Sequence, residues 1–415
     1  MESDPSSSSN GYLFILKGLS LLPIWHYLLI FTTLLICFLY NFLEIHFFED
    51  LFTGFSGSPV DFTYNSSSEI YSAVVSKCRI LHGRYSVTPW LSSPHLQTVF
   101  LNFFGRPPVF SYKRQLFTTS DGGTLALDWV INSDDSSSVV NKDESTPIAI
   151  LIPGLTSDSS APYLKHLAYH TAKRGWKVVV SNHRGLGGVP ITSDVFYNSG
   201  WTEDTRTVVN YLHKENPKAP LFMVGNSVGA NILVKYLGEE GENTPVAGAV
   251  AICSPWDLLA ISIRDFDDHA TRLFAKYETV DTYYRRCSST PYVKSVAIPL
   301  LCISALDDPV CTKEAIPWDE CRLNKNIVLA TVKHGGHLAF FEGITASSLW
   351  WVRAANEFLD VLHSSPYMHE QKQVSKPKAP LDSSIDQSPY INVTQDGMVA
   401  ALDSEPTTEN QKKNK

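Results

Sequence analysis

A serine inside a glycine-rich pentapeptide is the residue of this sequence best placed for covalent chemistry. The segment 225–229 (GNSVG) matches G-x-S-x-G, follows the apolar run LFMV and leads into ANILVKYL. A nucleophilic serine needs a sharp strand-to-helix turn that exposes its hydroxyl, and small residues two positions before and after allow that turn. The flanking patterns favour this interpretation over a glycine-rich turn with an idle serine. We predict that Ser227 is a nucleophile.

A serine nucleophile needs a base, and the sequence offers two histidines after a late strand pattern. Residues 327–341 (IVLATVKHGGHLAFF) are an apolar run that leads into both of them. Two glycines precede His337, so its loop can bring the ring close to Ser227. The rival, His334, directly follows the strand and has less freedom to swing. We predict His337 as the general base.

The base needs an orienting acid. In proteins with this type of serine turn, the acid follows the serine and precedes the histidine in the chain. Residues 298–310 (IPLLCISALDDPV) are a strand pattern that ends in two acids. Asp308 precedes a proline and is our predicted acid. Asp307, one residue earlier, stays open as the alternative.

The negative oxygen formed during the attack must meet preorganised N–H donors. The amide after the nucleophile, that of Val228, is one predicted donor. The second should come from the loop 153–156 (PGLT), which follows an early apolar strand. We predict the Leu155 amide as this donor, because Gly154 leaves room for its approach. This role is favoured over an ordinary Pro-Gly turn without a function.

Alternating apolar and amphipathic stretches predict the elements that position these residues. The strand candidates are Arg114–Thr118, Leu125–Ile131, Ile148–Ile152, Lys177–Ser181, Leu221–Val224, Ala247–Ile252, Leu300–Ile303 and Ile327–Val332. The helix candidates are Tyr163–Arg174, Glu203–Lys214, Val228–Leu237 and Ser348–Leu362. Continuous apolar strands that alternate with helices predict an α/β fold with a mostly parallel sheet covered on both faces. The hairpin signal SDGG (120–123) predicts an antiparallel edge.

Composition excludes several classes of protein. Lys and Arg number 34 against 42 Asp and Glu, so the net charge is −8, and no basic run supplies a site for nucleic acid. The seven cysteines are scattered without a CxxC pair, which favours buried or idle thiols over a disulfide framework or a zinc site. We expect no metal and no organic cofactor.

The chain ends divide the sequence further. Residues 18–43 contain no Asp, Glu, Lys or Arg and are long enough to cross a bilayer, with a clean span from about Ile24. A retained single-span anchor is favoured over a signal peptide or a buried core helix. We expect a disordered N-terminus over 1–17, a juxtamembrane linker over 44–89, one domain over 90–365 and a disordered tail over 366–415.

Several motifs, in order, resemble those of the membrane-anchored α/β-hydrolase-domain family. This group includes plant embryogenesis-associated proteins, animal phospholipid and monoacylglycerol esterases and fungal medium-chain ethyl ester synthases. The matching motifs are Trp90, HLQT (95–98), PGLT (153–156), NHRG (182–185), GNSVG (225–229), ALDDP (305–309), GGH (335–337) and FFEG (340–343). The resemblance implies the α/β-hydrolase fold, a small helical lid over about 255–297 and a single-span anchor. It assigns catalytic roles to Ser227, His337 and Asp308 or Asp307.

The combined hypothesis is a bilayer-tethered serine carboxylester hydrolase, a lipase or esterase, that acts on acyl lipids or other medium- or long-chain esters. We expect a single-pass protein of an endomembrane rather than a plastid. An acyltransferase that delivers the acyl group to an alcohol is the alternative among enzymes. A non-catalytic ligand-binding protein with the same fold is the alternative outside them. The polar tail and Asn226, beside the nucleophile, depart from the family pattern.

Overall fold

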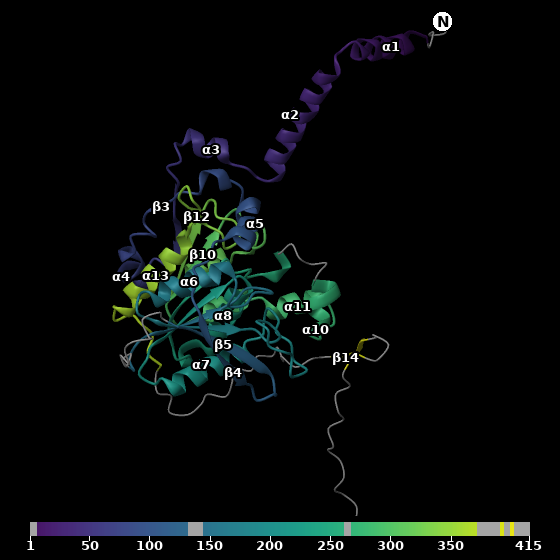
Figure 1. Cartoon of the computed structure of the whole chain (residues 1–415). Helices are drawn as coiled ribbons and strands as arrows, with labels where there is room; N and C mark the ends of the chain where they lie inside the picture. Colours follow the sequence, from purple (N-terminus) through teal and green to yellow (C-terminus); the bar gives the residue numbers. More distant parts are fainter. Residues whose placement is uncertain (1–5, 132–143, 261–266, 372–390, 394–398, 402–415) are drawn as a thin grey trace, which may run out of the picture.

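The computed structural model describes residues 6–131, 144–260, 267–371, 391–393 and 399–401 (Figure 1). Residues 132–143 and most of the expected tail lie outside the described residues. The serine-rich stretch expected to be disordered contributes to helix α1, Ser6–Ser20. Serines are favourable at a helix start, and the apolar sequence LFIL continues this helix.

A nine-stranded sheet forms the centre of the domain, in the order β2-β11-β10-β9-β8-β6-β7-β5-β4. The strands are β2 Asp61–Tyr64, β4 Tyr112–Thr118, β5 Thr124–Val130, β6 Ile148–Ile152, β7 Lys177–Asn182, β8 Leu221–Asn226, β9 Val246–Ile252, β10 Leu300–Ala305 and β11 Ile327–Val332. The six strands from β7 to β11 along this order run parallel, while β4, β5 and β2 pair antiparallel at the two edges. Each predicted strand is present, and the mostly parallel sheet with an antiparallel hairpin edge is confirmed.

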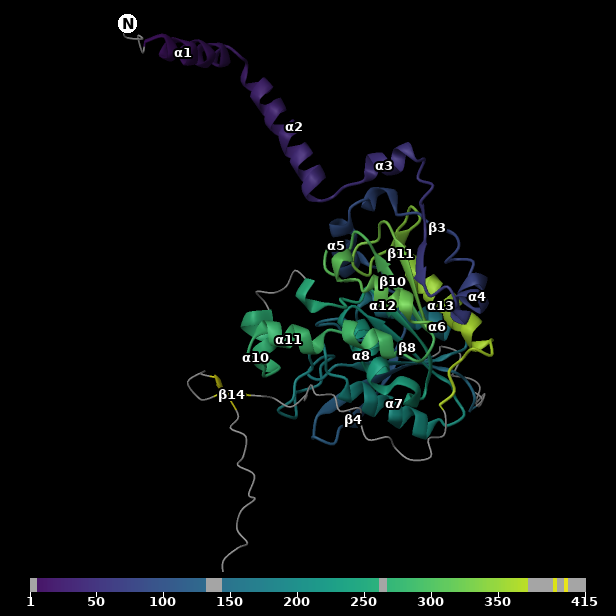
Figure 2. The ribbon, with the colours of Figure 1, turned by 180° about the vertical axis from the view of Figure 1, so that it is seen from behind.

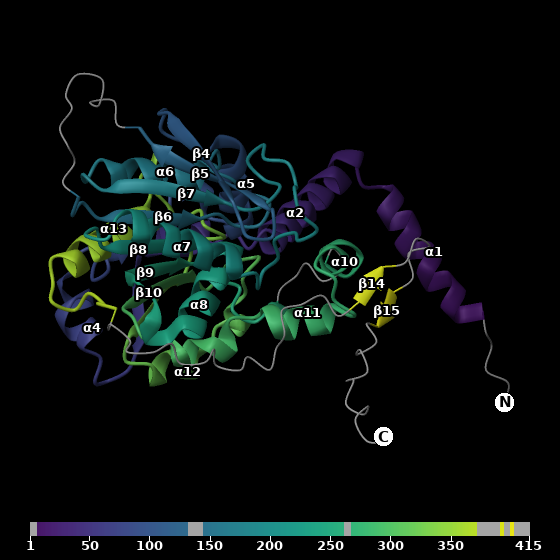
Figure 3. The ribbon, with the colours of Figure 1, turned by 90° about the horizontal axis from the view of Figure 1, so that it is seen from below.

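Helices cover both faces of the sheet (Figure 3). Alternate residues of β6 divide between two cores: Ile148 and Ile150 face one, and Ala149 and Leu151 face the other. This is the period-two alternation of a strand buried on both sides. The first core contains α7 Glu203–Glu215 and α8 Val228–Glu240, and the second contains α6 Pro162–Ala172 and α13 Trp350–His363.

Part of the segment expected as a linker belongs to the domain core. Strand β2 pairs with β11, and helix α4 (Glu69–Ala73) follows it. Val74, Cys78 and Leu81 are fully buried. The sequence did not indicate this because β2 is only four residues long and its neighbours show no extended apolar period.

Helix α2, Ile24–Phe42, projects away from the domain (Figures 1 and 2). It is the one helix among the described residues that is long and apolar enough to cross a membrane, and none of its residues is buried. The absence of burial argues against a core helix. A short helix, α3 (Phe47–Phe52), connects it to the domain.

The NHRG turn after β7 has a structural role. Arg184 has a side chain only 4 % exposed and pairs with Asp204 at the start of α7 and with Asp121 in the β4–β5 hairpin. Hydrogen bonding to the Arg184 guanidinium holds the pKa of Asp121 well below its usual range. The arginine therefore joins two distant elements, and its guanidinium is already occupied by carboxylates of the protein rather than open to a substrate anion.

We predict that Arg184→Met lowers the free energy of unfolding by about 2–4 kcal/mol, because it leaves two carboxylates without their buried partner. Arg322→Met is the matched control, since Arg322 and Asp319 are largely exposed and such pairs contribute about 0–1 kcal/mol. Thermal unfolding of the full chain in detergent measures both variants. Equal loss of stability in the two would contradict the assignment.

Candidate active site

Ser227 occupies a strained turn between β8 and α8. Its φ is 54° and its ψ −124°, a conformation that costs a non-glycine residue about 1–3 kcal/mol. The neighbouring glycines make this turn possible. A Cβ on Gly225 would lie 2.5 Å from the Gly229 carbonyl oxygen, and one on Gly229 would lie 2.3 Å from the Pro153 oxygen. The Ser227 amide donates to the Ile252 carbonyl at 2.8 Å and holds the turn in place.

A continuous hydrogen-bonded chain joins a serine, a histidine and an acid. His337 Nε2 lies 2.9 Å from Ser227 Oγ, and Nδ1 lies 2.9 Å from Asp308 Oδ2. An ionised carboxylate only accepts hydrogen bonds, so it favours the tautomer that carries the proton on Nδ1. The lone pair of Nε2 then faces the serine hydroxyl, as a general base requires.

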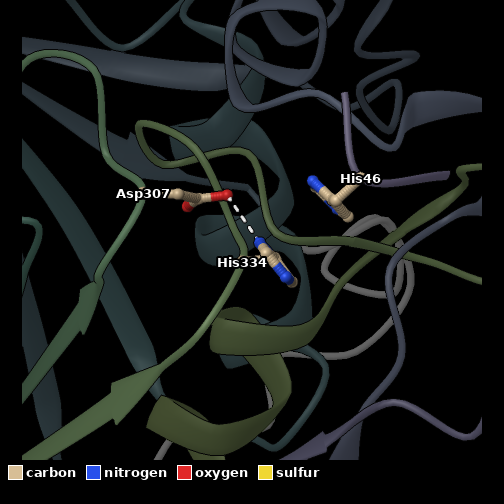
Figure 4. A group of neighbouring side chains, drawn as sticks. All are labelled: His46, Asp307 and His334. Carbon is tan, nitrogen blue, oxygen red and sulfur yellow. Dashed lines mark hydrogen bonds and ion pairs between the residues drawn. The ribbon is translucent and has the colours of Figure 1, made fainter. Parts of the chain in front are cut away.

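The two neighbouring acids hold different parts of the histidine loop. Asp308 contacts the His337 ring, has a side chain only 1 % exposed, and accepts amide hydrogen bonds from Val310 and Cys311 at 2.8 and 2.9 Å. Asp307 contacts His334 at 3.3 Å (Figure 4) and accepts the amides of residues 335 and 336 at 2.9 and 3.0 Å. The geometry therefore places Asp308, and not Asp307, against the ring.

The loop after β6 lies beside the serine, where the second oxyanion donor was expected. The Gly154 amide donates to Tyr163 Oη at 2.8 Å, and the Thr156 amide donates to Tyr197 Oη at 3.0 Å. These bonds fix the loop on both sides of Leu155. Val228 opens α8, and the first amides of a helix have no acceptor within it. Leu155 and Val228 both line the cavity at Ser227.

A cavity of about 630 Å³ opens onto Ser227 and His337. This volume lies in the size range of small-molecule sites. From the expected lid, Pro255, Leu258 and Asp267 line it. Of the other apolar residues in the expected lid, Leu259, Leu273 and Phe274 do not line the cavity. Ile261, Ile263 and Phe266 lie outside the described residues.

Helix α5, Pro94–Phe104, forms a wall of the cavity that the sequence did not assign to the site. Its Thr98 hydroxyl accepts the His337 amide at 3.0 Å and donates to the Pro94 carbonyl at 2.7 Å. A Cβ on Gly336 would lie 2.6 Å from the same Pro94 oxygen. The helix therefore packs directly on the histidine loop. The motif HLQT lies in this helix, but the sequence predicted neither the helix nor a role for Thr98.

Comparison with known proteins supplies the family. The embryogenesis-associated protein EMB8 of Picea glauca is 32% identical over 357 residues, which cover 73% of this chain and 76% of the relative. The chain belongs to the EMB8 group of α/β-hydrolases. Human phospholipase ABHD3 is 30% identical over 69% of this chain and 80% of its own length. The monoacylglycerol lipase of Saccharomyces cerevisiae is 24% identical over 66% and 79%. A family model described as serine aminopeptidase, S33, matches residues 143–278.

Membership in this α/β-hydrolase family and the observed sheet confirm the fold class, and the chain is a serine carboxylester hydrolase.

The α/β-hydrolase domain holds its histidine loop against the segment that follows α2. The rings of His334 and His46 stack at 3.6 Å with an interplanar angle of 9° (Figure 4). His334, the rival base, is therefore engaged with His46 and Asp307.

Two clusters among the described residues have metal-type donors, and neither fits an ion well. In the group of His46, Asp307 and His334, the imidazole lone pairs lie in the ring planes, and stacked parallel rings cannot aim both at one point. In the group of Cys253, Asp308 and His337, the histidine already bonds the acid, and burial raises the pKa of the Cys253 thiol well above its usual value.

We predict that Thr98→Val lowers kcat about tenfold with little change in KM, because the His337 amide loses its acceptor and the ring shifts. Thr98→Ser keeps the hydroxyl and should retain most of the activity. Steady-state hydrolysis of a chromogenic ester separates the two constants. A loss confined to KM, or equal losses in both variants, would show that Thr98 does not position the histidine.

The stacked histidines predict a pH dependence of stability. Burial, followed by the charge of His334, lowers the pKa of His46 to about 4 from 6.5. The unfolded state binds this proton more tightly, so its stabilising contribution is complete above about pH 6.5 and is lost as the pH falls toward 4.

His46→Phe keeps an aromatic ring in the stack and removes this proton. Between pH 6.5 and 4.5, wild type should lose about 2 kcal/mol more unfolding free energy than His46→Phe. Thermal melts of both proteins across this range measure the difference. Parallel pH profiles would contradict the role of His46.

Proposed function

We propose that this protein is a single-pass, membrane-anchored lipase that hydrolyses acyl esters of membrane lipids. Its catalytic triad is Ser227, His337 and Asp308. The observation that carries the proposal is the chain of contacts, 2.9 Å on either side of the His337 ring, at the edge of the cavity. This arrangement satisfies the distance requirement for a serine nucleophile, its base and the orienting acid.

In the proposed reaction, His337 Nε2 takes the hydroxyl proton while Ser227 Oγ forms a bond to the ester carbonyl carbon. The carbonyl oxygen becomes an oxyanion, which the amides of Leu155 and Val228 stabilise. The C–O bond to the alcohol then breaks, and the proton passes from His337 to the departing oxygen. Water, activated by the same histidine, attacks the acyl-serine and releases the fatty acid. Asp308 stays ionised and supports the imidazolium.

Three observations support a lipid as the substrate. The relatives include proteins named phospholipase and monoacylglycerol lipase. The cavity wall includes apolar side chains suited to an acyl chain, among them Val99, Leu101, Leu258 and Leu338. Helix α2 has the length and hydropathy of a bilayer span, which would keep the enzyme beside such a substrate.

The two neighbouring acids provide a matched pair of variants. We expect Asp308→Asn to lower kcat by about 10⁴, because an amide favours the wrong imidazole tautomer. Asp307→Asn should lower it by about tenfold or less, because it removes only loop contacts. Hydrolysis of a p-nitrophenyl ester measures both. Comparable losses, or a larger loss in Asp307→Asn, would show that Asp308 is not the triad acid.

Lipid hydrolysis itself can be tested on the full chain in phosphatidylcholine vesicles that contain a long-chain monoacylglycerol. Wild type should release fatty acid, and Ser227→Ala should release none above background. Mass spectrometry identifies the product, and added ethanol would reveal acyl transfer as an ethyl ester. Hydrolysis of water-soluble esters alone would contradict the lipid assignment.

A further inference from the structure

Helix α5 presents an apolar face to solvent. It contains no Asp, Glu, Lys or Arg, and its buried residues are Pro94, Gln97 and Leu101. The large apolar side chains that point outward are Leu96, 40 % exposed, Val99, 53 %, Phe103, 72 %, and Phe104, 62 %. Residues three, four and seven positions apart share one side of a helix. The face is therefore contiguous, and it reverses the pattern of an ordinary surface helix, which turns polar residues to water.

Helix α3 also presents apolar side chains to solvent. Its two acids contact the protein: Glu49, whose side chain is 53 % exposed, pairs with Lys333, and Asp50 lies 3.5 Å from His46. Three of its apolar side chains are exposed to solvent, namely Phe48, 55 %, Leu51, 47 %, and Phe52, 87 %. Beside it, Trp90 is half exposed and donates its indole N–H to the carbonyl of Ile344, itself 80 % exposed. Contiguous apolar surface of this kind marks a contact with another phase or molecule.

Hydrogen bonds tie the end of α2 to the start of α5. Leu43, the residue after α2, accepts the Ser93 hydroxyl, and Ser93 is also the N-cap of α5 through the Leu96 amide. The His46 amide donates to the Ser92 carbonyl at 2.9 Å. Figures 1 and 2 place α3 and α5 at the end of the domain from which α2 departs. A bilayer crossed by α2 would therefore meet α3 and α5 at its surface.

The same face borders the active-site cavity. Val99 and Phe103 of α5 line the cavity together with Ser227 and His337. Thr98, on the same helix, accepts a hydrogen bond from the His337 amide. One helix thus contributes to the exposed apolar face, the cavity wall and the position of the predicted base.

We infer that the outward faces of α3 and α5 insert into the headgroup region of the bilayer crossed by α2, with the cavity mouth against the membrane. The inference rests on the proposed function, since it takes a lipid ester as the substrate. Docking would let that ester enter the cavity from the membrane without crossing water. The occupant is a lipid surface rather than a partner protein, because the face is continuous with the end of the membrane helix. Transfer of these apolar side chains out of water favours docking.

The test uses the full chain in phosphatidylcholine vesicles and the double variant Leu96→Glu/Phe104→Glu. Neither residue lines the cavity. We expect hydrolysis of a vesicle-embedded long-chain monoacylglycerol to fall at least roughly tenfold, while hydrolysis of water-soluble p-nitrophenyl butyrate stays within about twofold. The matched control is Leu116→Glu/Leu323→Glu, on β4 and α12 (Trp318–Leu323), where the leucines are 64 % and 76 % exposed. This control should leave both rates unchanged.

Equal loss on both substrates would overturn the inference, because it would indicate a damaged site. Unchanged lipid hydrolysis would overturn it as well. Failure of wild type to hydrolyse either ester would instead contradict the proposed function, and docking would then be decided by a physical measurement that needs no turnover.

That measurement places a polarity-sensitive fluorophore on Phe104→Cys or, as control, Leu323→Cys, both in a Cys37→Ser background. The other six cysteines are buried and so are poorly reactive. Doxyl-labelled lipids should quench the fluorophore at 104 at least roughly twofold more than at 323. Preferential quenching at 104 by aqueous iodide would overturn the docking surface.

Discussion

The position of one loop, residues 333–337 after β11, governs the whole site. Three independent hydrogen-bonding groups hold it: Asp308 on the His337 ring, Asp307 on the glycine amides and Thr98 on the His337 amide. A shift of about 1 Å in such a contact can cost a hundredfold in rate. The glycines let this loop bend back toward Ser227, but that same freedom requires external bonds to select a single conformation.

The opposite partner, Ser227, is fixed by covalent geometry and close packing. Its positive φ is imposed by a turn that only glycines at both flanks permit, and the parallel strands on either side cannot move independently. The sheet therefore fixes the position of the nucleophile, whereas side chains from several separate elements fix the position of the histidine. Substitutions around the histidine should accordingly give graded losses of activity, while those in the serine turn should affect folding.

The sequence predicted the sheet because its inner strands are buried on both faces and appear as continuous apolar runs. The bounds of β6 and β11 were obtained from the pattern alone. The apolar pattern does not separate Asp307 from Asp308, because these adjacent aspartates lie on one loop and differ only in the direction of their side chains. The proline that follows favoured Asp308 but left Asp307 open. Strand β2 was too short to be recognised. The outward face of α5 was missed because an apolar stripe has the same pattern whether it meets a core or a membrane.

The most direct test of the central claim is covalent labelling of the full chain in detergent with a fluorophosphonate, which reacts with an activated serine. We expect labelling of wild type at Ser227, located by peptide mass spectrometry, and loss of labelling in Ser227→Ala and His337→Ala. His334→Ala should still label, because that ring stacks on His46. A folded wild-type protein that does not label, or one that labels equally after His337→Ala, would contradict the account.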